Sequence, residues 1–221
     1  MENKPKILVT GATGRLGAYI ISELEVYFDV TPVGIEHWDF TYPIPDGKYD
    51  LILHMGAYTD VKKAEKEQNK CFQTNAFGTF NLVMKYLDTP FVYISTEYAK
   101  NPMGVYALTK QLGEEVVKYH PHHLILRTAF KPTPWPFPMA YIDQMTQGDS
   151  VDIIAKVIAT VVASWDKKTS RFTFCGTGRK SWYDVAVKTK PDVKPNKVAD
   201  YVAETGAPIP YDYLDDNVET P

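Results

Sequence analysis

Tyr106 and Lys110 are the two side chains of this sequence whose types and spacing best suit proton transfer. Both fall in a stretch, residues 105–119, whose apolar periodicity predicts a helix, and residues four apart share one helix face. A phenol, with an ordinary pKa near ~10, is a poor proton donor at neutral pH, but a nearby ammonium stabilises the phenolate and lowers that pKa toward the working range. The pair therefore predicts acid/base chemistry at a carbonyl or an alcohol.

Thr96 would complete this set. It follows the apolar run 91–95, which predicts a strand, and open α/β sheets bind their ligands at the carboxyl ends of the strands. The Thr96 hydroxyl would donate a hydrogen bond to the substrate oxygen while Tyr106 transfers the proton. We therefore predict Thr96, Tyr106 and Lys110 as the catalytic residues.

A glycine-rich turn lies near the start of the chain, after the apolar run 7–9 and before an amphipathic stretch, 18–24. Strand, glycine turn and helix in this order can bind a pyrophosphate, because backbone amides and the helix dipole stabilise it and glycine leaves room for it. We predict a bound dinucleotide, NAD or NADP, contacted by Gly11, Thr13, Gly14, Arg15, Leu16 and Gly17.

Two residues point to different dinucleotides. Glu36 lies just past a second predicted strand, where a carboxylate would accept hydrogen bonds from a ribose 2′-hydroxyl and favour NAD. Arg15 would instead pair with a 2′-phosphate and favour NADP. Both cofactors stay open.

Short apolar runs alternate with helical stretches along the first part of the chain. This alternation predicts an α/β fold with a doubly wound parallel sheet. The strands are expected over 7–9, 30–35, 49–54, 91–95 and 124–127, and the helices over 18–24, 61–70, 76–87 and 105–119.

Composition changes after residue 128. Proline occupies every second position from Pro132 to Pro138, which excludes a helix or a central strand and predicts a stiff connection to a small lobe. Beyond it an apolar stripe predicts a helix over 151–165, followed by a strand over 171–175 and a helix with Ser181 as its N-cap. From residue 188 onward we expect irregular structure.

The bulk composition favours a small-molecule partner. With 24 Lys plus Arg against 27 Asp plus Glu, the net charge of -3 provides no field that would attract nucleic acid or an anionic membrane. No signal peptide or membrane span is evident, so we expect a cytoplasmic protein. Cys71 and Cys175 lack a metal-like or redox-like spacing, and Pro121 splays the neighbouring histidines, so we predict no metal site.

Together these motifs resemble those of the extended short-chain dehydrogenase/reductases, most of all the members that reduce nucleotide-linked 4-keto sugars. The resemblance implies a Rossmann domain over residues 1–128, a small substrate lobe over 129–221 with helix 151–165 packed back on the Rossmann domain, and an NAD(P)-dependent oxidoreductase of nucleotide-sugar metabolism. The matching stretches are 10–17, 39–40, 49–65, 95–98, 105–114, 124–128, 176–186 and 214–215.

The resemblance also assigns roles to individual residues. Tyr106 would be the acid/base, Lys110 would anchor the cofactor ribose and modulate the tyrosine pKa, and Thr96 would orient the substrate. Further cofactor contacts are implied at Asp39 and Phe40, near the adenine, and at Gly56, Ala57 and Tyr58. The implied substrate contacts are Thr59, Val61, Thr96, Glu97, Tyr98 and Phe130.

The sequence departs from the family on the substrate side. Glu97 stands where the family has Asp, Phe130 stands where it has Trp, and only seven residues separate Tyr98 from Tyr106. The chain also stops soon after Leu214-Asp215, which implies loss of the family's C-terminal helix. The chemistry is therefore better supported than the sugar.

Three interpretations stay open. The first is a reductase of a nucleotide-linked 4-keto-deoxysugar. The second is an epimerase or dehydratase of the same superfamily. The third is a non-catalytic, cofactor-binding regulatory subunit. The expected partner is a nucleotide-sugar, and a homodimer is one possible assembly.

Overall fold

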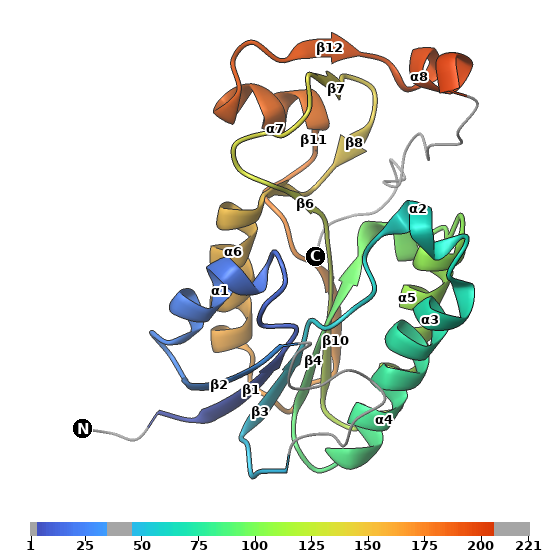
Figure 1. Ribbon diagram of the computed structural model, residues 1–221. Helices are drawn as coiled ribbons and strands as arrows, with labels where there is room; N and C mark the ends of the chain where they lie inside the picture. The colour runs from blue at the N-terminus through green and yellow to red at the C-terminus, as the bar shows by residue number, and fades with distance from the viewer. Residues whose placement is uncertain (1–3, 35–45, 206–221) are drawn as a thin grey trace.

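A six-stranded parallel sheet forms the centre of the computed structural model, which describes residues 4–34 and 46–205 (Figure 1). Its order is β10-β5-β4-β3-β1-β2, and every neighbouring pair is parallel. The strand order reverses between β1 and β3, and such a reversal places a crevice at the carboxyl ends of the strands. The predicted doubly wound α/β fold is confirmed. The strands are β1 (Lys6–Thr10), β2 (Asp29–Val33), β3 (Leu51–His54), β4 (Phe91–Thr96), β5 (His123–Thr128) and β10 (Arg171–Phe174).

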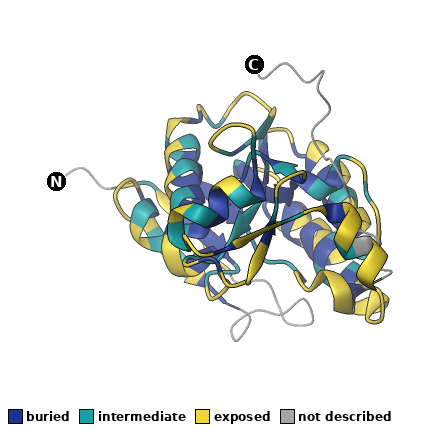
Figure 2. Ribbon diagram, turned by 90° about the horizontal axis from the view of Figure 1, so that it is seen from above, coloured by how far each residue is buried: buried dark blue, intermediate teal, exposed yellow. Residues whose placement is uncertain are grey.

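Alternate residues of β1 pack on different faces of the sheet. Ile7 and Val9 pack with α1 (Gly17–Leu24) and α6 (Val151–Ser164), whereas Leu8 packs with α4 (Gly78–Lys85) and α5 (Val105–Lys118). All three side chains are buried, as expected for a parallel strand covered on both faces. Figure 2 shows the buried residues gathered in the sheet and on the helix surfaces turned toward it.

A smaller lobe stands at the carboxyl edge of the sheet (Figure 1). Its core is built on Trp135 and Trp182, whose ring centroids lie 6.0 Å apart. Ser181 caps the following helix as predicted, because its hydroxyl accepts from the Asp184 amide at 3.1 Å in a capping box. The lobe contains β7 (Met139–Tyr141), β8 (Met145–Thr146), β11 (Lys180–Ser181), α7 (Trp182–Thr189), β12 (Lys194–Asn196) and α8 (Val198–Thr205).

The chain returns from the lobe to the sheet before it builds the rest of the lobe. Helix α6 packs against α1, and β10 extends the sheet beside β5. Where the chain crosses between the two parts, β6 (Phe130–Lys131) pairs with β9 (Asp149–Ser150). Residues 129–205 thus contribute to the sheet layer as well as to the lobe, and a division at residue 128 remains a prediction.

Some local predictions differ from the structure. The helix expected over 61–70 is two helices, α2 (Val61–Ala64) and α3 (Gln68–Phe72), because the Gln68 side chain donates to the Glu65 carbonyl at 3.2 Å and competes with helix continuation. Irregular structure from residue 188 is wrong for 194–205, where β12 pairs with the distant β7.

Several predicted contacts fall outside the described residues. Glu36, Asp39 and Phe40, predicted near the adenine and its ribose, and the closing Leu214-Asp215 are among them. Among the helices that are described, none is long and apolar enough to cross a membrane.

A buried ion pair fixes α5 to the sheet. Glu114 on α5 has no exposed surface, and its two carboxylate oxygens accept hydrogen bonds from Arg127 on β5 at 2.8 and 2.6 Å. Ser95 on β4 donates a further hydrogen bond to the same carboxylate. Arg127 also donates to the Ala99 carbonyl at 3.2 Å. Removal of one partner would leave the other charge buried without its counter-ion, which is strongly destabilising.

Glu114→Ala is therefore expected to lower the free energy of unfolding by about 3–5 kcal/mol, measured by urea unfolding. Glu115→Ala is the matched control, because its partner Lys118 lies 2.6 Å away in an exposed pair on the same helix. That control should lose less than about 1 kcal/mol. Equal losses in the two variants would show that the buried pair does not fix the helix.

Candidate active site

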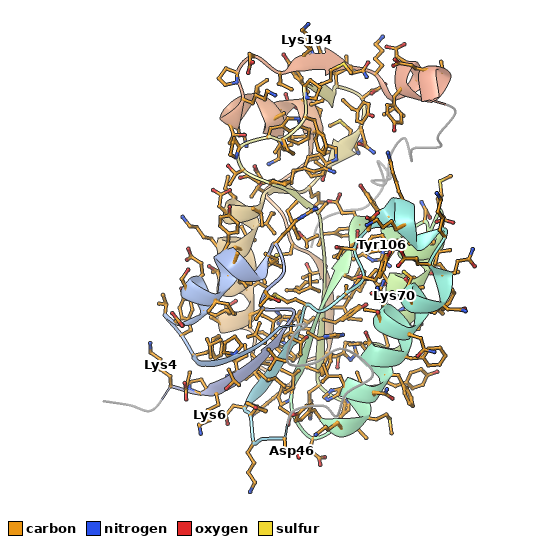
Figure 3. All side chains as sticks on the ribbon, in the orientation of Figure 1. Lys4, Lys6, Asp46, Lys70, Tyr106 and Lys194 are labelled. Atoms are coloured by element: carbon orange, nitrogen blue, oxygen red, sulfur yellow. The ribbon has the colours of Figure 1, made fainter. Side chains whose placement is uncertain are left out.

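Thr96 and Tyr106 meet at the carboxyl edge of the sheet. Thr96 is the buried last residue of β4, and Tyr106 is the second residue of α5, partly exposed at the end of that helix nearest the lobe (Figure 3). The Thr96 hydroxyl lies near enough to the Tyr106 phenol to affect its pKa. The Thr96 oxygen accepts a hydrogen bond from the Tyr98 amide at 3.3 Å. The structure thus brings the predicted orienting hydroxyl and the predicted acid/base together, while their catalytic roles remain predictions.

The pKa of Tyr106 moves in the direction opposite to the one predicted. Burial raises it well above its ordinary value of 10.0, and the neighbouring Tyr98 phenol, with its ring centroid 6.5 Å away, adds to the rise. The nearby Thr96 hydroxyl opposes this rise without cancelling it. In the ligand-free protein, Tyr106 therefore keeps its proton at neutral pH.

Lys110 explains why the expected lowering is absent. Its side chain is buried, its Nζ donates to the Ile94 carbonyl at 2.8 Å, and the same atom lies 4.1 Å from the centre of the Tyr93 ring. Burial lowers the pKa of Lys110 to about 7, although the Glu114 charge opposes the shift. The amine is therefore held toward the sheet and is only partly charged near neutral pH, so it does not stabilise a Tyr106 phenolate.

Two glycines of the N-terminal turn are required by close packing. Gly11 has a φ of 75°, and a Cβ there would lie 2.7 Å from the Gly56 amide nitrogen. A Cβ on Gly17 would lie 2.0 Å from the Ala12 carbonyl oxygen. The first of these contacts places the turn directly beside the loop that follows β3, so two of the predicted cofactor-binding segments adjoin.

The middle of the turn is open to a ligand. Thr13, Gly14 and Arg15 are exposed, and a Cβ on Gly14 would meet only the Gly11 carbonyl oxygen, at 3.1 Å. Leu16 is buried in the core beneath the turn, so only its backbone is available to a cofactor. An accessible glycine turn at the start of α1 fits the pyrophosphate of a dinucleotide.

A buried histidine holds the loop after β3. His54 shares hydrogen bonds with the hydroxyls of Thr10, at 2.6 Å, and Thr79, at 3.0 Å. Burial, with a smaller contribution from the Lys110 charge, lowers the pKa of His54 to about 3, so the ring is neutral. The Thr10 hydroxyl also accepts from the Gly56 amide at 3.4 Å. The network therefore fixes Gly56 against the glycine turn.

Asn75 holds the same loop from the other side. Its side-chain oxygen accepts from the Tyr58 amide at 2.7 Å, and its nitrogen donates to the Tyr58 carbonyl at 3.1 Å and to Thr109 of α5 at 3.0 Å. Asn75 lies in a π-helix, η1 (Gln73–Phe77), a geometry that is frequent at functional sites. Asn75 therefore links the loop of Ala57 and Tyr58 to the helix that carries Tyr106.

Sequence reasoning missed both His54 and Asn75. The available signal was an asparagine directly before the predicted helix 76–87, where its side chain can bond to backbone groups outside the helix. The partners of both residues come from other elements of the fold, which the sequence pattern does not pair.

The predicted substrate contacts are only partly brought together. Thr59 and Val61 are exposed at the start of α2, and Tyr98 packs edge to face against Tyr106. Glu97 is buried instead, with one oxygen accepting from Thr146 at 2.8 Å and the other from the Gln147 amide at 2.9 Å. Glu97 therefore joins the end of β4 to the lobe, a role different from the predicted sugar contact.

Phe130 lies beside the glycine turn. It lines a pocket of about 260 Å³ together with Arg15, Pro132 and Val151. Lys131, which sequence reasoning did not assign, has its pKa lowered by burial and also by the Arg15 charge. Two cations thus lie near each other at the glycine turn, where phosphate groups would be favoured.

Comparison with known proteins identifies relatives of the chain. The family model described as RmlD substrate binding domain matches residues 5–131, more than half of the sequence. A dTDP-4-dehydrorhamnose reductase of Aggregatibacter actinomycetemcomitans is 24% identical over 94% of this chain and 86% of its own length. One from Burkholderia thailandensis is 30% identical over 51% of this chain and 45% of its own length. The chain therefore spans most of one curated relative and about half the length of others.

Solved structures agree on the fold. A dTDP-4-dehydrorhamnose reductase of Bacillus anthracis, in complex with NADP, superposes with a TM-score of 0.76 at 23% identity, covering 97% of this chain and 90% of that one. A Clostridium acetobutylicum dTDP-4-dehydrorhamnose reductase gives 0.75 at 27% identity, covering 89% and 85%.

The depressed pKa of Lys110 predicts a pH-dependent stability. Because that pKa falls from 10.5 to about 7, the folded protein binds fewer protons than the unfolded chain between these values, so its stability rises with pH across this window. Lys110→Met removes the effect. The stability of this variant relative to the parent is therefore expected to fall by about 3–5 kcal/mol between pH 6 and pH 10.

Urea unfolding of both proteins across this pH range measures the difference. Lys118→Met, which removes an exposed lysine from the same helix, controls for the loss of one positive charge. A stability difference between Lys110→Met and the parent that does not change with pH would contradict the buried, deprotonating lysine.

Proposed function

The chain belongs to the family described as RmlD substrate binding domain, and on that premise we propose that it is an NAD(P)H-dependent reductase of a nucleotide-linked 4-keto-deoxysugar. The observation that carries the proposal is the placement of Thr96, at the end of β4, near Tyr106, in the first turn of α5, at the sheet edge that also holds the glycine turn. Relatives of 24% and 30% identity carry the name dTDP-4-dehydrorhamnose reductase. The dTDP-linked 4-keto sugar is therefore the first substrate to test.

Such a reduction adds a hydride to the carbonyl carbon and a proton to the carbonyl oxygen. When bound, a reduced nicotinamide supplies the hydride. Tyr106 supplies the proton, and Thr96 donates a hydrogen bond that orients the carbonyl oxygen. Tyr106 is protonated in the ligand-free protein and so carries the proton that the reduction needs, but its raised pKa makes it a weaker acid than an ordinary phenol. Lowering that pKa toward the working range would be the task of the bound cofactor and of Lys110.

The cofactor would be held by the two adjoining loops. Thr13, Gly14 and Arg15 are accessible in the turn, and Lys131 adds positive charge near Arg15. Gly56, Ala57 and Tyr58 would line the cofactor on the side fixed by the buried histidine and asparagine. Lys110 would hold a ribose hydroxyl, and such a contact would compete with its present bond to the Ile94 carbonyl.

The sugar would lie between Tyr106 and the lobe. Thr59, Val61, Tyr98 and Phe130 would contact it. Glu97 is not part of this set, because both of its oxygens already accept hydrogen bonds from the lobe.

Tyr106→Phe tests the proton-transfer role. The variant should lose roughly 10²- to 10⁴-fold in kcat for oxidation of NADPH or NADH with a 4-keto sugar, because a positioned acid contributes about that much. Its affinity for the cofactor should stay within about twofold, since the ring is retained. Tyr119→Phe, an 89% exposed tyrosine that follows the same helix, is the control and should behave as the parent.

A screen of both cofactors against nucleotide-linked 4-keto sugars separates the three interpretations. Net cofactor consumption supports the reductase, and conversion of the sugar without consumption would indicate an epimerase or dehydratase. Absence of turnover together with a stoichiometric protein partner would indicate a regulatory subunit. Full activity of Tyr106→Phe would remove Tyr106 from the mechanism in any of these cases.

We further propose that two copies of the chain pair through the outer surface of α4 and α5. Apolar side chains recur there every three or four residues and remain exposed, and the two helices pack side by side (Figure 1). Monomeric proteins rarely leave such continuous apolar surface uncovered. The exposed residues are Phe77, Phe80, Met84, Leu87, Leu108 and Leu112.

The double variant Phe80→Glu with Met84→Glu is expected to shift the protein from twice the chain mass to the chain mass in light scattering. Val26→Glu, at an exposed apolar residue after α1, is the control and should leave the mass unchanged. A parent protein that has the mass of a single chain at all concentrations would refute this assembly.

A further inference from the structure

The first turn of α5 is capped by a side chain from another helix. The backbone amide of Val105 donates to Oε1 of Glu65 at 2.7 Å. Gly104, at the N-cap position, has no side chain with which to cap the helix. Amides of a first helical turn have no partner within the helix, so a carboxylate here satisfies one of them and also interacts favourably with the helix dipole.

The conformation of Gly104 leaves room for the contact between the Glu65 carboxylate and the start of α5. The φ of this glycine is 90°, in the region that side chains disfavour, and a Cβ there would lie 2.5 Å from the same Glu65 oxygen. The positive φ favours glycine at this position, and the absence of a Cβ leaves room for the Glu65 carboxylate beside the Val105 amide.

Glu65 is itself held in place. It follows α2, whose first turn is capped by Asp60 through the Lys63 amide at 3.0 Å, and Ala64 beside it is buried. Its carbonyl accepts from the Gln68 side chain at 3.2 Å. Figure 1 shows α2 beside the start of α5, and the two helices are in contact. The carboxylate is thus presented to α5 from a short, defined helix.

Tyr106 is the second residue of α5, directly after the capped amide. The opposite end of the helix is anchored through Glu114 and Arg127, two turns beyond Tyr106. At the near end, the connection from Tyr98 is only seven residues long; Arg127 bonds its first residue, Ala99, and Glu65 bonds its last, Val105. A loosened first turn would displace the phenol relative to Thr96.

We infer that Glu65 is a positioning residue for Tyr106, which acts by capping α5 across the shortened segment before the tyrosine. This inference rests on the proposed reductase function. The segment 59–65 begins at the proposed sugar contacts and ends at Glu65. It therefore connects those contacts to the helix that carries Tyr106.

The test compares Glu65→Ala, Glu65→Gln and the parent, with Glu115→Ala as a control for the loss of an exposed glutamate. Glu65→Ala should lower kcat about tenfold, because small misplacements of a reacting group are costly. The Kd for NADPH should stay within about twofold. Glu65→Gln keeps an acceptor oxygen and should restore kcat to within about twofold of the parent. A merely structural role would not produce this separation of kcat from binding together with rescue by glutamine.

Amide hydrogen exchange at Val105, measured without ligands, keeps the two proposals separable. Faster exchange in Glu65→Ala than in Glu65→Gln demonstrates the cap whether or not any sugar is turned over. Two outcomes would overturn the positioning role and leave the reductase proposal intact. In the first, Glu65→Ala exchanges faster at Val105 but keeps the kcat of the parent. In the second, Glu65→Ala and Glu65→Gln lower kcat equally. If the parent turns over no sugar, the reductase proposal fails, and the positioning role fails with it.

Discussion

The ion pair between Glu114 and Arg127 decides where α5 lies on the sheet. A buried carboxylate needs hydrogen-bond donors, and here they come from Arg127 on β5 and Ser95 on β4, so the helix is satisfied in one position only. Tyr106, Lys110 and Glu114 are spaced by four residues and share one helix face. The position that satisfies Glu114 therefore also sets Lys110 under the Ile94 carbonyl and Tyr106 against Thr96.

A second polar network extends this fixation to the cofactor side. Thr10, His54 and Thr79 form a buried chain of hydrogen bonds, which continues because the Thr79 hydroxyl donates to the Asn75 carbonyl at 2.7 Å. Asn75 then contacts both the Tyr58 backbone and Thr109 of α5. Fully bonded buried networks of this kind are rigid. The glycine turn, the loop after β3 and helix α5 are thus parts of one rigid arrangement that exists before any ligand binds.

The sequence made the sheet predictable because each strand carries a local signal. The apolar run Ile7, Leu8 and Val9 predicts a buried strand, and the glycines after it predict a turn. Neither prediction requires the residues that lie beside them in the fold. The proximity of Thr96 and Tyr106 was also foreseeable, since a strand end and the following helix start meet at one sheet edge.

The features that escaped prediction are those whose partners lie far away in sequence. Glu97 contacts Thr146 and Gln147, about fifty residues later, and Glu65 caps Val105, forty residues later. The direction of the Tyr106 pKa escaped for a related reason. Four-residue spacing places Lys110 on the right face but does not reveal that its amine turns toward the Ile94 carbonyl and loses charge through burial.

The lobe is built from two separate passages of the chain, and this orders its formation in time. Trp135 belongs to the first passage and Trp182 to the second, with α6 and β10 lying between them in sequence. The contact between the two indoles closes the loop that contains α6 and β10, and a contact that closes a long loop costs more chain entropy than a local one. We therefore expect the core of the lobe to form after the local contacts between the sheet and its helices.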